Sequence, residues 1–265
     1  MVSQHLLYEK IANKKIKLAH RGYTKNYQEN TLLACTSAIN NNRIDGFEID
    51  ITITNDDILV LFHDSDLKRL FKNNKSKIND LNFSEVNNLF IKDDISIKKM
   101  YSRKTKICTL KRLIEFIDQI PKFNKIINIE FKYDKTDISK IKLLVNKTYI
   151  LVKKYLNNIY FTSYNKLIVD YLVNNYKNDL MIGIIINEEE ELCQYLKKEK
   201  ELEILIKNKN IRSTYFRQAI EKKYILGIYT YNSYYYQDSK NNINDIDKNI
   251  IKDNNIDIII FDKLD

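Results

Sequence analysis

The chain has 265 residues, 44% of them hydrophobic and 30% charged, which is typical of a soluble globular protein. Its formal net charge of +9 favours anionic partners. The basic residues are interleaved with acidic ones, and the sequence has no basic arm, zinc-finger spacing or aromatic RNA-binding motif, so no nucleic-acid partner is expected. The 3 cysteines, Cys35, Cys108 and Cys193, are too scattered for a disulfide framework, which predicts a reducing compartment.

The start of the chain, Met1–Lys17, lacks the apolar core and cleavage site of a signal peptide, so no signal peptide is expected. Its charged and polar residues are interpreted as a polar leader, and His5 within it as incidental. No stretch of the sequence reaches the apolar length of a membrane span. A cytoplasmic or otherwise intracellular, soluble protein is therefore expected.

Short apolar runs alternate with amphipathic segments from the beginning of the chain. The run Ile16–Ala19 predicts a strand, Asn30–Asn41 predicts a helix, and Gly46–Thr54 and Ile58–His63 predict two more strands. The polar, lysine-rich stretch Ser65–Lys106 interrupts this pattern. It is too long for a simple connection, so we expect an insertion of the kind that forms lids or binding loops.

Beyond the insertion, helices and strands alternate regularly. The predicted helices are Leu110–Ile120, Ile138–Tyr155, Tyr164–Tyr176, Glu188–Lys200, Thr214–Lys223 and a surface helix over Gln237–Asn255. The predicted strands are Ile126–Phe131, Ile159–Thr162, Leu180–Ile186, Leu202–Ile206, Ile225–Tyr231 and Ile256–Phe261. Apolar runs separated by helices indicate parallel strands buried on both faces. About eight of them favour an α/β fold, a TIM-type (β/α)8 barrel, with residues 1–265 as one domain and 65–106 as its insertion.

Charged side chains gather at the ends of the first four predicted strands. They are His20, Arg21, Glu48, Asp50, His63, Asp64, Glu130 and Lys132. Because the carboxyl ends of parallel barrel strands meet on one face, we expect these side chains to lie together at that end of the barrel.

Strand geometry groups the acids further. Glu48 and Asp50 are two residues apart and point to the same side of their strand. An exposed strand face with salt bridges would also explain them, but acids inside an apolar parallel strand need a cation. Three carboxylates, with Glu130 as the third, suit a hard divalent cation, Mg²⁺ or Ca²⁺, better than Zn²⁺.

An ordered series of motifs resembles the glycerophosphodiester phosphodiesterase family. The motifs are Leu18–Gly22, Glu29–Thr31, Asp45–Asp50, Phe62–Asp64, Leu67–Arg69, Thr109–Leu110, Glu130–Lys132, Phe161–Ser163 and Tyr229–Asn232. The resemblance starts near Ile16, covers nearly the whole chain and is thinner after Lys132.

This resemblance implies a metal-dependent TIM-type barrel that hydrolyses glycerophosphodiesters to sn-glycerol 3-phosphate and an alcohol. It implies that His20 and His63 form a general acid/base pair, with either histidine able to take either part. It further implies that Glu48, Asp50 and Glu130 bind the divalent cation.

The remaining implied roles surround these groups. Arg21 and Lys132 correspond to phosphate contacts, and Glu29 and Asp64 to residues that orient the histidines or the metal site. Tyr229 lies near the substrate in this scheme, where the family has a tryptophan, which leaves the alcohol preference open.

Two alternatives stay open on the same scaffold. A lysophospholipase D-like enzyme with peripheral membrane contact would fit the basic charge and the tyrosine-rich segment Tyr234–Tyr236. A catalytically silent barrel could bind phosphorylated ligands, although the complete set of catalytic and ligand residues argues against it.

Overall fold

The structure is a computed structural model that describes residues 2–12, 14–71, 76–90, 105–186, 191, 193, 196, 202–207, 214–222, 224–230 and 256–261. The predicted surface helix Gln237–Asn255 lies outside these residues. The predicted helix Glu188–Lys200 lies outside them except at single positions.

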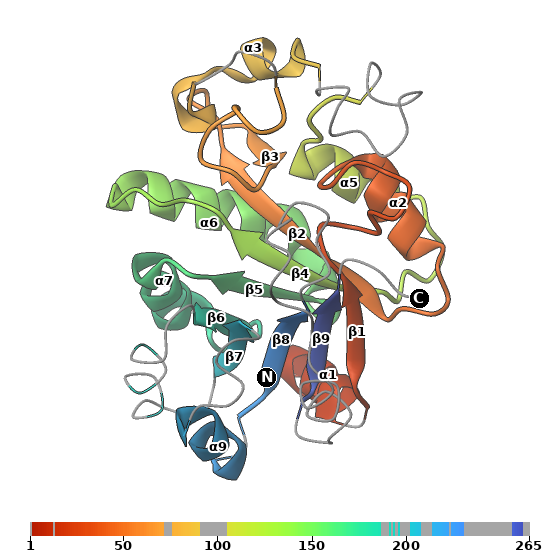
Figure 1. The fold of residues 1–265 in the computed structure, drawn as a ribbon, viewed down its shortest axis with the longest axis vertical. Coiled ribbons are helices and arrows are strands. Elements are labelled where there is room, and N and C mark those ends of the chain that lie inside the picture. Colours follow the sequence, from red (N-terminus) through yellow and green to blue (C-terminus); the bar gives the residue numbers. More distant parts are fainter. Residues whose placement is uncertain are drawn as a thin grey trace, which may run out of the picture.

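The strands form one sheet that closes on itself. Their bounds are β1 Ile16–Ala19, β2 Gly46–Ile53, β3 Leu59–Leu61, β4 Ile126–Phe131, β5 Ile159–Ser163, β6 Ile182–Ile186, β7 Leu202–Lys207, β8 Leu226–Thr230 and β9 Ile258–Phe261. The sheet order of these 9 strands is β1-β9-β8-β7-β6-β5-β4-β2-β3, and β1 also pairs with β2. Only β3 is antiparallel to its neighbour, so the remaining eight described strands make a closed parallel ring (Figure 1). The predicted (β/α)8 barrel is confirmed.

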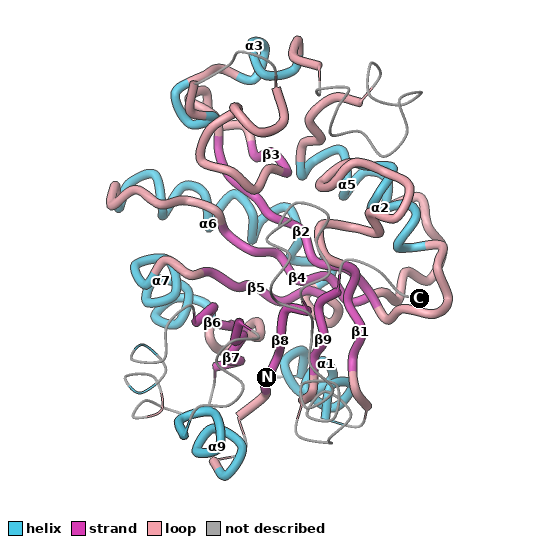
Figure 2. Tube along the Cα trace, viewed as in Figure 1, coloured by secondary structure: helices cyan, strands magenta, loops and turns pink. Residues whose placement is uncertain are grey.

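Helices lie around the outside of this ring (Figure 2). They are α2 Leu32–Ile39, α5 Leu110–Ile117, α6 Ile138–Val152, α7 Lys166–Tyr176 and α9 Thr214–Glu221, with a short 3-10 turn, η2 Lys153–Tyr155, after α6. The side chains of Thr31, Thr109, Asp137 and Asn165 accept hydrogen bonds from backbone N–H groups in the first turns of α2, α5, α6 and α7. These caps start each helix at a defined residue after the preceding strand or loop. None of the described helices is both long and apolar enough to cross a bilayer.

Alternation along the strands separates the core from the barrel interior. On β2, Phe47, Ile49 and Ile51 belong to the outer hydrophobic core beneath the helices, whereas Glu48 and Asp50 alternate with them on the inner face. Every residue of β2 is buried. The sheet therefore carries buried acids on one face of a strand and an apolar core on the other.

The interpretation of the start of the chain as a polar leader was wrong. Residues Val2–Ala12 form helix α1. Leu7 and Ile11 of this helix are each 1% exposed and pack with Ile16, Ile126 and Ile258, the first residues of β1, β4 and β9. Helix α1 thus covers the amino-terminal end of the barrel (Figure 1).

The stretch predicted as an insertion builds its own small core beside β3. Its described part contains the 3-10 turn η1 Ile78–Asp80 and helix α3 Phe83–Asn87. A separate cluster of buried apolar side chains joins this part to β3 and its flanks: Val60, Phe62, Leu67, Leu70, Phe71, Ile78, Val86 and Ile107. Figure 1 shows β3 and α3 together at one extremity of the molecule.

We predict that Leu7→Ala lowers the free energy of unfolding by about 2–5 kcal/mol, because it leaves a cavity under the barrel. Leu6 is the matched control, since it lies on the same helix and is 43% exposed. Leu6→Ala should change stability by less than about 0.5 kcal/mol in urea unfolding. Equal effects of the two substitutions would contradict the packing of α1 against the strands.

Candidate metal centre and active site

Three buried carboxylates meet inside the carboxyl end of the barrel. Glu48 and Asp50 come from β2 and are 0% exposed, and Glu130 comes from β4 and is 3% exposed. One oxygen from each lies within 4.8 Å of the others. Asp50 and Glu130 are direct partners in the β2–β4 register, so the parallel pairing itself places the two strands' acids side by side.

The negative charge of this trio is only partly compensated. Burial and the neighbouring Asp50 and Glu130 raise the pKa of Glu48 well above its usual value, and no hydrogen bond to its Oε1 is found among the described residues. The ammonium of Lys132 contacts Glu130 and lies 3.5 Å from Oδ1 of Asp50. Although burial opposes it, the pKa of Asp50 is lowered by His63, Lys132 and Arg21. Oxygen donors with an uncompensated buried charge fit a hard divalent cation.

Arg21 is fixed over the trio by a strained turn. Its φ of 55° lies in the left-handed region, and its backbone N–H donates to Oε2 of Glu48 at 2.9 Å. The next residue, Gly22, has a φ of 79°, and a Cβ there would lie 2.7 Å from the carbonyl carbon of Ala34. The turn therefore needs glycine, and it aims the Arg21 guanidinium at Asp50, whose Oδ2 is 3.3 Å from Nε.

Each residue of the motif Glu29–Thr31 makes a different polar contact. Glu29 accepts a hydrogen bond from Nη1 of Arg21 at 2.8 Å. The side chain of Asn30 donates to Asp50 at 2.8 Å and accepts from the Asp50 backbone N–H at 3.0 Å. Thr31 caps helix α2. No role for Asn30 was predicted from the sequence, where its place in the motif was the signal that could have found it.

His63 is held by an acid and an arginine. Its Nδ1 lies 2.7 Å from Oδ1 of Asp64, and Nε of Arg69 donates to Oδ2 of Asp64 at 2.6 Å. Although burial opposes it, hydrogen bonds from His63 and Arg69 lower the pKa of Asp64 to about 2. An ionised Asp64 can only accept, so Nδ1 of His63 carries the proton. Sequence reasoning assigned no role to Arg69, although it ends the motif Leu67–Arg69.

Burial lowers the pKa of His63, with Arg21 and Lys132 acting in the same direction against Asp50 and Asp64. Burial thus favours the neutral form of the ring, and because Nδ1 faces Asp64, Nε2 is the unprotonated nitrogen of that form.

His20 lies on the other side of Arg21. Its Nε2 is 3.3 Å from Nε of Arg21 and 3.8 Å from Oε2 of Glu48. Its ring meets the ring of Tyr229 edge to face, with 5.6 Å between centroids. The hydroxyl of Tyr229 donates to Oε2 of Glu130 at 3.1 Å. The tyrosine thus packs on one candidate acid/base and bonds to one candidate ion ligand.

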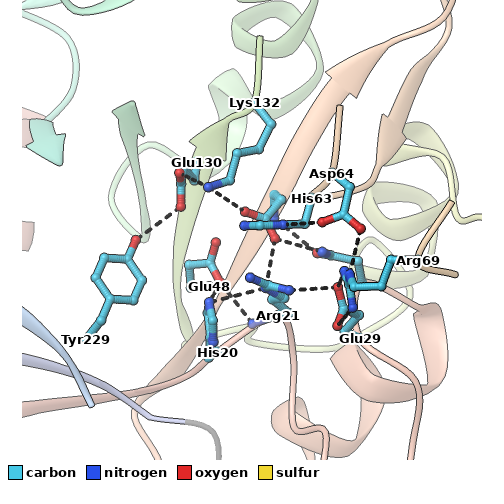
Figure 3. A network of polar contacts seen from close by, with 12 residues as sticks. His20, Arg21, Glu29, Glu48, His63, Asp64, Arg69, Glu130, Lys132 and Tyr229 are labelled. Carbon is cyan, nitrogen blue, oxygen red and sulfur yellow. Dashed lines mark hydrogen bonds and ion pairs between the residues drawn. The ribbon is translucent and has the colours of Figure 1, made fainter. Parts of the chain in front are cut away.

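All the side chains predicted from the sequence as site residues belong to this one network (Figure 3). They are His20, Arg21, Glu29, Glu48, Asp50, His63, Asp64, Glu130, Lys132 and Tyr229. Their catalytic and binding roles stay predictions.

Fold and site together define a (β/α)8-barrel protein with a candidate cation site at the carboxyl end of its strands. The sequence pattern of the glycerophosphoryl diester phosphodiesterase family matches residues 20–265, so the chain belongs to this family.

The chain is also similar to individual proteins, one of them uncharacterized. An uncharacterized protein of Mycoplasma genitalium is 36% identical over 155 residues, which are 58% of this chain and 60% of the relative. A glycerophosphodiester phosphodiesterase of Bacillus altitudinis is 33% identical over 117 residues, 43% of this chain and 44% of the relative. The matches thus span about half the length of these curated relatives. The crystal structure of a glycerophosphodiester phosphodiesterase from Thermotoga maritima is similar over 94% of each chain, with a TM-score of 0.66 and 27% identity.

We predict that Mg²⁺ or Ca²⁺ raises the melting temperature of the purified protein, because an ion that binds the folded state relieves the repulsion among the three acids. At a concentration of 100 times the dissociation constant the stabilisation is about 2.7 kcal/mol. Glu48→Gln should remove most of this shift. Glu115→Gln, at a position on α5 whose side chain is 59% exposed, should keep it. An equal ion-induced shift in both variants would exclude Glu48 as a ligand.

Proposed function

We propose that this chain is a metal-dependent phosphodiesterase that hydrolyses glycerophosphodiesters to sn-glycerol 3-phosphate and an alcohol. One observation carries the proposal: His20 and His63, which follow β1 and β3, belong to the same polar network as the buried carboxylate trio. His20 lies 3.8 Å from Glu48 and contacts Arg21, which contacts Asp50. His63 joins the network through Asp64, Arg69 and Glu29, which binds Arg21. Membership of the glycerophosphoryl diester phosphodiesterase family supports the same chemistry.

Charge neutralisation comes first in such a reaction, because a phosphodiester anion repels nucleophiles. Glu48, Asp50 and Glu130 would hold Mg²⁺ or Ca²⁺, which would supply positive charge and Lewis acidity to the site. Arg21 presents a guanidinium suited to two phosphate oxygens, and Lys132 adds a second cation. Because Lys132 contacts Glu130 and Asp50, it competes with an ion for these two acids.

Proton transfer falls to the two imidazoles. The Nδ1 proton of His63 is engaged by Asp64, so Nε2 is the nitrogen that takes up or returns a proton. His20 is fixed between the Arg21 guanidinium and the Tyr229 ring. One histidine deprotonates the nucleophile, either water or a neighbouring glycerol hydroxyl, and the other protonates the departing alkoxide.

Release of glycerol 3-phosphate from glycerophosphocholine by the purified chain tests this proposal. Turnover is expected with Mg²⁺ or Ca²⁺ and none with EDTA. Lysophosphatidylcholine, assayed in parallel, identifies a lysophospholipase D-like enzyme if it is the better substrate. If neither ester is hydrolysed with any divalent ion, the chain is a catalytically silent barrel.

We predict that His20→Asn and His63→Asn each lower kcat at least about 100-fold, because general acid–base catalysis is worth about 10²–10⁴-fold per group. Both variants should keep a cooperative thermal transition. His5→Gln is the control, since His5 lies on α1, which covers the opposite end of the barrel. Wild-type turnover in either of the first two variants would refute the acid/base pair.

A further inference from the structure

We infer that Arg69 is a positioning residue that fixes the tautomer of His63 through Asp64 and holds the Arg21 guanidinium through Glu29. This inference rests on the proposed function. It also assigns the insertion, residues 65–106, a role in positioning the catalytic groups. Arg69 lies in the segment that follows β3, within the stretch predicted as the insertion.

The guanidinium of Arg69 joins two acids, Asp64 and Glu29. Among the described residues, no hydrogen bond links these two acids to each other. Its Nε donates to Oδ2 of Asp64 at 2.6 Å. Its Nη1 and Nη2 donate to the two carboxylate oxygens of Glu29 at 2.9 Å and 2.6 Å. Only a planar fork with several fixed donors serves both acids at once, and an ammonium group has no such geometry.

The first branch of contacts runs from Arg69 through Asp64 to His63. Because Arg69 binds Oδ2 of Asp64, the remaining oxygen, Oδ1, faces Nδ1 of the imidazole at 2.7 Å. The carboxylate is thereby fixed in position and in charge, and it holds the ring with Nε2 unprotonated. Loss of the arginine frees the carboxylate to rotate, so the preference for one tautomer weakens.

The second branch leads to Arg21. Glu29 is 4% exposed, and its Oε1 accepts hydrogen bonds from both Arg69 and Arg21. Arg21 in turn contacts His20 and Asp50. Arg69 therefore connects both halves of the candidate acid/base pair. It reaches His63 through Asp64, and it reaches His20 through Glu29 and then Arg21.

The insertion core is what holds Arg69 in place. Its neighbours Leu67, Leu70 and Phe71 are buried in the cluster that includes Ile78 and Val86. The backbone N–H of Phe71 donates to the carbonyl of Leu67 at 2.9 Å, which closes a tight turn around Arg69. The apolar residues of the insertion thus give the guanidinium a rigid support.

Arg69→Lys tests this inference, because it keeps the charge and removes the fork. We expect kcat on glycerophosphocholine to fall about 10- to 100-fold, as for other residues that orient catalytic groups. Arg112→Lys, at an exposed position on α5, is the matched control and should keep wild-type kcat.

A spectroscopic readout separates positioning from a general loss of stability. Long-range ¹H–¹⁵N spectra of ¹⁵N-histidine-labelled protein at about pH 8, where imidazoles are neutral, report which ring nitrogen carries the proton. With 3 histidines in the chain, His5→Gln and His20→Asn assign the signals. We expect the Nδ1–H form of His63 in the wild type and a mixture of tautomers in Arg69→Lys. An unchanged tautomer or an unchanged kcat in Arg69→Lys would overturn the inference.

Asp64→Asn provides the same test if Arg69→Lys does not fold, since it breaks the first branch and leaves the Arg69–Glu29 pair. It should also release the tautomer of His63, and a His63 ring that keeps its wild-type tautomer there would overturn the inference. The spectra need no turnover. An inactive wild-type protein whose His63 tautomer still depends on Arg69 would therefore refute the proposed function and leave the positioning role standing.

Discussion

The burial of three carboxylates within 4.8 Å of one another is the constraint on which the rest of the site depends. Like charges in a poorly solvated interior repel strongly, so the fold needs cations around them. Arg21 and Lys132 are two such cations, and each lies within two residues of the end of a barrel strand. The left-handed turn at Arg21 persists because contacts with Glu48, Glu29 and Asp50 over-determine it.

Much of this arrangement could be predicted from the sequence because parallel barrels follow simple rules. Alternation on β2 put Glu48 and Asp50 on one face, and the predicted strand Ile126–Phe131 has the same bounds as β4. Helix α1 was missed because, among its residues whose side chains are described, Leu7 and Ile11 are the buried ones, too few to produce a clear period in a short polar segment. The contacts of Asn30 and Arg69 depend on residues distant in the chain, which periodicity does not reveal.

Departures from the family motifs have local physical compensation. The turn before β3 holds Asp57 in the left-handed region, with a φ of 64°, a conformation that glycine adopts at the least cost. The side chain of the preceding Asp56 bonds Thr54 at 2.6 Å and the backbone of Phe83 at 2.8 Å, which stabilises the turn against the insertion. Tyr229, in the place of a tryptophan, keeps an aromatic face toward His20 and reaches Glu130 with its hydroxyl.

Helix α1 covers the amino-terminal end of the barrel. Leu7 and Ile11 pack against the first residues of β1, β4 and β9, so in the described part of the chain this helix covers the end of the barrel opposite the acidic trio.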